Sequence, residues 1–166
     1  LGDFRVLHFA THAIASGDSP LDSFIALGSR SRNDNGLLQA WEVMAQMRLR
    51  SRIVVLSGCD TASGREAAGE GLIGLTRAFH YAGAPGVIAS LWPVNDKATA
   101  ALMKSFYQAL AAGESPDAAL RNAQLAMLDG SESFWLRRYR WSHPFYWAAF
   151  QLSGAATRER PATGSV

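Results

Sequence analysis

The chain of 166 residues has little cysteine and no long apolar run. Its single cysteine, Cys59, excludes an internal disulfide and a cysteine-based zinc site, and favours a reducing compartment, so we expect a cytoplasmic protein. No apolar stretch approaches the roughly 18 residues of a membrane helix, and no signal-peptide pattern opens the chain, so we expect no membrane contact. The net charge is only +2 and most arginines are scattered, which argues against direct nucleic-acid binding.

What is present is the composition of a folded domain. Hydrophobic residues make up 48% of the chain and charged residues 18%, which excludes wholesale disorder. We expect one domain over residues 1–155 and a disordered tail over residues 156–166. The chain begins with Leu1 rather than Met, so we expect its start to be a processing or fragment boundary.

Short apolar runs alternate along the chain with segments of helical periodicity. The expected strands are 4–10, 24–27, 53–56, 86–92 and 146–152, and the expected helices are 38–47, 72–82, 96–112 and 116–128. This alternation predicts an α/β fold with a mostly parallel sheet and helices on both faces.

Cys59 follows directly after the buried strand 53–56 and the dipeptide Ser57-Gly58. In α/β sheets, reactive groups lie just beyond the carboxyl ends of strands. Gly58 permits a sharp turn that leaves neighbouring amide groups open to a ligand. A thiol with a reference pKa of about 8.5 needs a nearby base to become a nucleophile at neutral pH. The alternative is that Cys59 is a small buried hydrophobic residue.

Of the four histidines, His12 fits the role of that base best. His8 lies inside a strand and is interpreted as a core or near-core residue, His80 as a helix residue facing solvent or a turn, and His143 as a loop residue. His12 lies at a strand end among small residues that leave room for a substrate. His12 and Cys59 at matching strand ends predict a thiol-nucleophile site, although a structural role for His12 remains the alternative.

The third strand end, after residues 86–92, carries candidate substrate contacts. Trp92 could form the wall of a specificity pocket, and Asp96 could lie at its base or rim. A carboxylate there would favour a basic residue before the cut. The alternative for Asp96 is a first-turn carboxylate stabilised by the helix dipole.

Residues 69–74 match the pattern G-x-G-x-x-G without its usual context. About ten residues separate them from the preceding strand, and no acidic residue follows at the ribose-binding distance. We interpret these glycines as close helix packing and a mobile loop. We expect no nucleotide, no other cofactor and no metal.

Five motifs together resemble the CHAT domain, a family of caspase-like peptidases related to separases and often fused to TPR repeats. The motifs are residues 9–12, 56–61, 69–72, 90–94 and 143–150. The resemblance implies a caspase-like three-layer α/β fold and a His–Cys dyad carried by His12 and Cys59. It also implies hydrolysis of a protein substrate, in prokaryotic defence or regulated proteolysis.

The chain also departs from the family pattern. Ala13 replaces the glycine that usually follows the catalytic histidine, and the amides of Ala13 and Cys59 are the expected oxyanion donors. By this resemblance we expect the early strands of the domain to be missing, so that the chain is a C-terminal portion that works with an N-terminal half, a regulatory or sensor module, or another copy of the chain. Such a sheet would have an exposed edge. A non-catalytic caspase-like interaction module is the alternative function.

Overall fold

The computed structural model of the chain describes residues 4–14, 16, 19–29, 31, 35–58, 68–130 and 141–155. For residues 68–72 it describes the backbone only. Its main sheet has the order β1 (Val6–Phe9), β5 (Ile53–Leu56), β6 (Gly86–Ser90) and β7 (Phe150–Gly154). The first three strands are parallel and β7 is antiparallel to β6. The expected tail over residues 156–166 lies outside the described residues.

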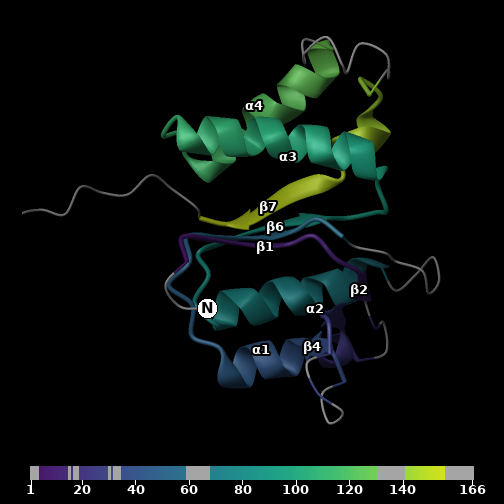
Figure 1. Cartoon of the computed structure of the whole chain (residues 1–166), viewed down its shortest axis with the longest axis vertical. Coiled ribbons are helices and arrows are strands. Elements are labelled where there is room, and N and C mark those ends of the chain that lie inside the picture. The colour runs from purple at the N-terminus through teal and green to yellow at the C-terminus, as the bar shows by residue number, and fades with distance from the viewer. Residues whose placement is uncertain are drawn as a thin grey trace, which may run out of the picture.

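Helices cover both faces of this sheet, as the sequence predicted (Figure 1). Helices α1 (Ala40–Gln46) and α2 (Ala68–Tyr81) lie on one side, and α3 (Asp96–Ala111) and α4 (Pro116–Asp129) on the other. The central strands β5 and β6 are buried along their whole length, which explains their continuous apolar sequences. The chain therefore has the three-layer α/β arrangement of a caspase-like fold.

Strand alternation divides the core into two clusters. Leu7, Val54 and Leu56 pack towards α1 and α2, whereas Ile53, Val55 and Ile88 pack towards α3 and α4. Phe79 anchors the first cluster and Phe106 the second, and both are fully buried.

A second, antiparallel sheet consists of β2 (Ala13–Ile14), β3 (Phe24–Ala26) and β4 (Leu37–Gln39). The expected helix at 38–47 therefore begins at Ala40, because residues 37–39 pair with β3 and Gln39 forms a capping box with Glu42. The expected last strand, 146–152, is shifted to β7, because Pro144–Tyr146 forms a 3-10 turn instead.

Two local features hold the helices in place, and the second confirms the predicted close packing at Gly74. Asn95 caps α3, and its side-chain oxygen accepts hydrogen bonds from Lys97 N at 3.0 Å and Ala98 N at 3.3 Å. Gly74, the last glycine of the G-x-G-x-x-G pattern, packs closely because a β-carbon there would collide with the backbone of Pro20. The capped start of α3 fixes Asp96 next to the carboxyl end of β6.

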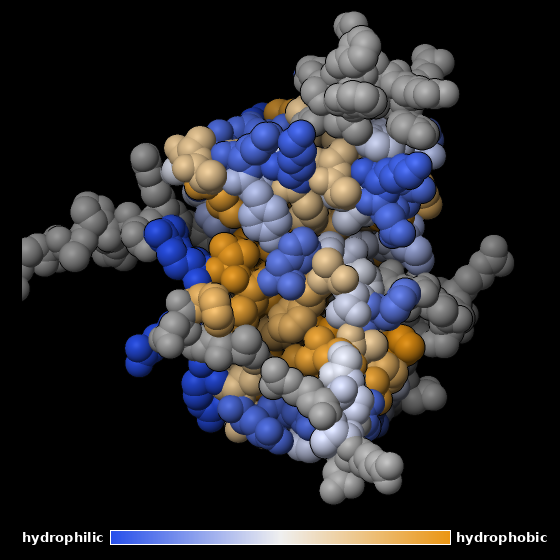
Figure 2. All heavy atoms as spheres, in the orientation of Figure 1, coloured by the Kyte–Doolittle hydropathy of each residue, from blue (hydrophilic) through white to orange (hydrophobic). Residues whose placement is uncertain are grey.

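Strand β1 forms one edge of the main sheet, and within the described residues no strand pairs with its outer side. Phe4, two residues before β1, is 60% exposed. Figure 2 shows apolar side chains gathered across the middle of one face, at the height of the sheet in Figure 1, between more polar regions. In the part of the chain that is described, no helix combines the length and hydropathy needed to cross a membrane.

Candidate active site

His12 lies in the turn that leads from β1 into β2, and its backbone is tied to the second sheet. The carbonyl oxygen of His12 accepts a hydrogen bond from Ala26 N at 2.8 Å. The neighbouring Thr11 hydroxyl donates to the carbonyl of Ala26, also at 2.8 Å. These two bonds fix the turn at the carboxyl edge of the main sheet, where the sequence predicted it.

Gly58 brings the end of β5 into contact with this turn. The amide of Ala13 donates a hydrogen bond to the Gly58 carbonyl oxygen at 2.8 Å. A β-carbon at Gly58 would collide with the carbonyl oxygen of Thr11, so any side chain here would force the two backbones apart. Glycine is required at this position by close approach, since its φ angle is not positive.

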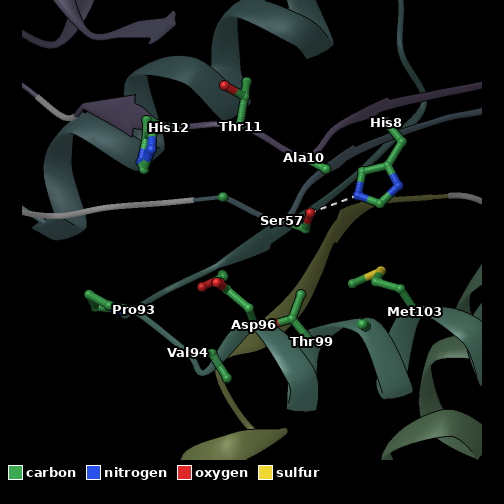
Figure 3. A pocket seen from close by; sticks show the side chains of 13 residues that line it. His8, Ala10, Thr11, His12, Ser57, Pro93, Val94, Asp96, Thr99 and Met103 are labelled. Atoms are coloured by element: carbon green, nitrogen blue, oxygen red, sulfur yellow. Dashed lines mark hydrogen bonds between the residues drawn. The ribbon is translucent and has the colours of Figure 1, made fainter.

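A cavity of about 690 Å³ lies at this edge (Figure 3). His12 reaches it from the end of β1, and Asp96 reaches it from the first turn of α3 on the opposite side. Its lining consists of His8, Ala10, Thr11, His12, Ser57, Gly58, Ser90, Pro93, Val94, Asp96, Thr99, Ala100 and Met103. The cavity thus combines an imidazole, a carboxylate and several hydroxyl groups with apolar walls.

Of the predicted site residues that the structure describes, Ala13 and Trp92 do not line this cavity. Cys59 lies outside the described residues, so its distance from His12 is not part of the described geometry. Ala13 is buried and its amide already donates to Gly58. Trp92 is not among the lining residues; its indole nitrogen donates to the Phe145 carbonyl at 2.9 Å, and the two rings stack. The functional roles of these three residues therefore stay predictions.

The structure reveals a hydrogen-bonded group that sequence reasoning missed. His8 Nε2 lies 2.7 Å from Ser57 Oγ, and His8 Nδ1 lies 2.9 Å from the hydroxyl of Tyr107 on α3. The interpretation of His8 as a packed core or near-core residue is wrong, because its side chain is partly exposed, belongs to neither core cluster and lines the cavity. A polar residue on an otherwise apolar strand, directed towards the cavity side of the sheet, was the available signal.

Partial burial shifts the pKa values within this group. Burial lowers the pKa of His8 below its ordinary value of 6.5 and raises the pKa of Tyr107 to about 12. In both cases the cause is desolvation, which disfavours the charged form. Both side chains are therefore mainly neutral at pH 7.

The two remaining histidines have local roles outside the cavity lining. His80 bridges the Ala84 carbonyl and the Ser153 hydroxyl, at 2.8 Å and 3.1 Å, so it contacts a neighbouring turn as predicted. His143 accepts a hydrogen bond from Phe145 N at 3.2 Å. Across the described ranges, no group of three or more His, Cys, Asp or Glu side chains is arranged to hold a metal ion.

The fold has three layers, and the His12 turn contacts Gly58 at the carboxyl edge of its main sheet. These features define a caspase-like α/β domain. The family model for the CHAT domain matches residues 1–155, and the chain belongs to the CHAT domain family. Tetratricopeptide repeat protein 28 of mouse is 39% identical over 119 residues, and its human counterpart is 38% identical. These 119 residues are 72% of this chain but about 4% of the length of either relative.

We predict that Gly58→Ala separates the two strand ends and destabilises the fold. The added methyl group meets backbone atoms, which cannot move as a flexible side chain would, so the free energy of unfolding should fall by about 1–3 kcal/mol. Urea unfolding followed by circular dichroism measures the change. Gly28→Ala is the matched control, because nothing lies within 4 Å of a β-carbon there. Equal unfolding midpoints for the two variants would contradict the prediction.

We also predict a pH dependence that originates at His8. Its folded-state pKa is lowered, so below about pH 6.5 the unfolded chain binds more protons than the folded one, and stability falls as the pH decreases. His8→Phe keeps a ring at this position and removes the titration. Melting temperatures measured from pH 7.5 down to pH 5 should decline less for His8→Phe than for the wild type. Parallel declines would show that His8 does not contribute.

Proposed function

We propose that this domain is a cysteine endopeptidase with His12 and Cys59 as its catalytic dyad. The observation that carries the proposal is the contact between the His12 turn and Gly58, both of which line one cavity. Cys59 is the next residue after Gly58, and consecutive Cα atoms are about 3.8 Å apart. The proposed nucleophile is therefore the direct neighbour, in the sequence, of a residue that contacts the His12 turn.

In the proposed mechanism, His12 accepts the proton of Cys59 and the thiolate attacks the scissile carbonyl carbon. The C–N bond breaks as His12 returns the proton to the leaving amine, which leaves a thioester on Cys59. Water then attacks the thioester with His12 as the base, which releases the acid product and restores the thiol. No electron acceptor or cofactor enters this sequence of steps.

The tetrahedral oxyanion needs hydrogen-bond donors, and we propose the amides of Cys59 and Ala13. The Ala13 amide donates to Gly58 O at 2.8 Å in this conformation. It would become available once the Gly58 carbonyl turns away, and substrate binding would have to produce that change.

We further propose that the substrate is a protein with a basic residue before the cut. Asp96 lines the cavity and is exposed at the start of α3, where its carboxylate can meet a lysine or arginine side chain. Trp92, held against Phe145, would form an apolar wall beside this position. Thr99 and Ser90 supply further polar groups to the lining.

Regulated proteolysis in the cytoplasm is the setting that we propose. The mouse and human relatives are named as tetratricopeptide repeat proteins, which supports a repeat-containing regulatory module as the partner of this domain. The family resemblance also implied prokaryotic defence, and regulated cleavage of a protein partner is common to both settings. That shared activity is the function we propose.

The dyad is tested with Cys59→Ala and His12→Ala. Cleavage of arginine-containing reporter peptides should fall by about a thousandfold or more in the cysteine variant and by about a hundredfold or more in the histidine variant. Melting temperatures should change little, because the His12 side chain is exposed and belongs to neither core cluster, and Cys59→Ala removes only one sulfur atom. Cleavage that survives Cys59→Ala would refute the dyad. A wild-type protein that folds but never reacts with thiol-directed peptide probes would favour the interaction module instead.

Asp96→Asn tests the substrate preference. Removing the carboxylate should lower kcat/KM for arginine peptides relative to leucine peptides by about tenfold to a hundredfold, because a charge-assisted hydrogen bond contributes about 1.5–3 kcal/mol. Asp117→Asn is the matched control, since Asp117 occupies the equivalent first turn of α4 and does not line the cavity. An unchanged ratio for Asp96→Asn would remove this residue from the specificity pocket.

A further inference from the structure

Three side chains from three different elements are joined by hydrogen bonds at the cavity. Ser57 follows β5, His8 lies within β1, and Tyr107 lies on α3. The distances are 2.7 Å from Ser57 Oγ to His8 Nε2 and 2.9 Å from His8 Nδ1 to the Tyr107 hydroxyl. His8 and Ser57 line the cavity that also holds His12, and Figure 3 shows their hydrogen bond. We call these three residues the Tyr107–His8–Ser57 network.

The strand register explains why these side chains meet. His8 is paired with Val55 in the parallel β1–β5 ladder, and Ser57 lies two residues after Val55. Side chains two residues apart along a strand lie on one side of it, so His8 and Ser57 are directed towards α3. Ser57 N also donates to Phe9 O at 3.1 Å, which extends the ladder to Ser57. Ser57 is thus held to β1 through both its backbone and its side chain.

Both ring nitrogens of His8 have a hydrogen-bonding partner in this network. A neutral imidazole has one N–H donor and one acceptor nitrogen, and each hydroxyl group can donate or accept. Both hydrogen bonds can therefore form with either tautomer of His8. The His8 and Tyr107 rings also lie 5.6 Å apart between centroids, which limits rotation of the imidazole. The imidazole ring of His8, held in this way, fixes the position of the Ser57 hydroxyl through their hydrogen bond.

We propose that the Tyr107–His8–Ser57 network positions the segment that carries the nucleophile. Ser57-Gly58 directly precedes Cys59 in the sequence, and the network fixes Ser57 relative to β1, the strand that leads to His12. The network therefore sets the direction in which the chain enters Cys59, and its three members are positioning residues. This inference rests on the proposed function.

The network also links the nucleophile segment to the helix that carries Asp96. Tyr107 lies three turns along α3 from Asp96, and Phe106 beside it is fully buried in the core. Helix α3 is therefore a rigid connection between the proposed specificity residue and the end of β5. Removal of the Tyr107 hydroxyl should act at the nucleophile, although Tyr107 itself does not line the cavity that holds His12.

The experiment compares two thiol reagents on Ser57→Ala and Tyr107→Phe. A peptidyl arginine acyloxymethyl ketone reacts only when the thiol, the imidazole and the peptide are aligned, whereas iodoacetamide has no such requirement. We expect the rate with the ketone to fall by about tenfold or more in both variants, because misalignment is costly to oriented reactions. The rate with iodoacetamide should change by less than about threefold. Ser57→Thr keeps the hydroxyl and should retain most of the rate with the ketone.

Ser153→Ala is the matched control. Ser153 also bonds to a histidine, His80, and that pair links α2 to β7 away from the cavity lining. A purely structural serine–histidine bond should lower the melting temperature and leave the ratio of the two rates unchanged. We expect this result for Ser153→Ala and a changed ratio for Ser57→Ala.

The outcomes separate this inference from the proposed function. If wild-type Cys59 reacts with the ketone and both network variants keep the wild-type ratio of rates, the positioning role is overturned and the dyad stands. If the wild-type protein is not labelled by the ketone at Cys59, as determined by peptide mass spectrometry, the proposed function fails. Labelling at Ser57 in place of Cys59 would overturn both, because Ser57 would then be the nucleophile.

Discussion

The close backbone contact between Gly58 and the His12 turn is the constraint on which the candidate site depends. Ala13 donates to the Gly58 carbonyl, and Thr11 occupies the space that any side chain at position 58 would need. The contact forms where two parallel strands end, so the register of the sheet and the geometry of the site are determined together. A change in either strand that shifts its end by one residue would separate the two segments.

Much of the fold could be predicted from the sequence because its central strands are buried on both faces. Such strands appear as unbroken apolar runs, and their alternation with helical periodicity indicates a parallel sheet. The short strands β2–β4 gave no comparable signal apart from residues 24–27. A strand of two or three residues has too few positions for alternation to be recognised, and Leu37 also fitted the periodicity of the helix that follows.

The part of the site that could be predicted consists of single residues that follow directly after strands. His12 and Asp96 were placed by their position after a strand, and the structure brings both to one cavity. His8 was interpreted as a core or near-core residue because it lies inside a strand, although strand periodicity places it on the same side as Ser57. Tyr107 could not be found in this way, because its contact with His8 depends on how α3 is rotated against the sheet.

The division of the interior into two clusters has a consequence for natural variation in this protein. The layer of α1 and α2 contacts β2–β4 and thereby the turn that bears His12, whereas the layer of α3 and α4 reaches the opposite wall. Volume changes in one layer can be compensated among its own residues, since the sheet lies between the layers. Compensating substitutions should therefore occur in two sets, one on each side of the sheet, and the hydrogen bonds of His8 to Tyr107 and Ser57 are the described point at which the α3 layer reaches the ends of β1 and β5.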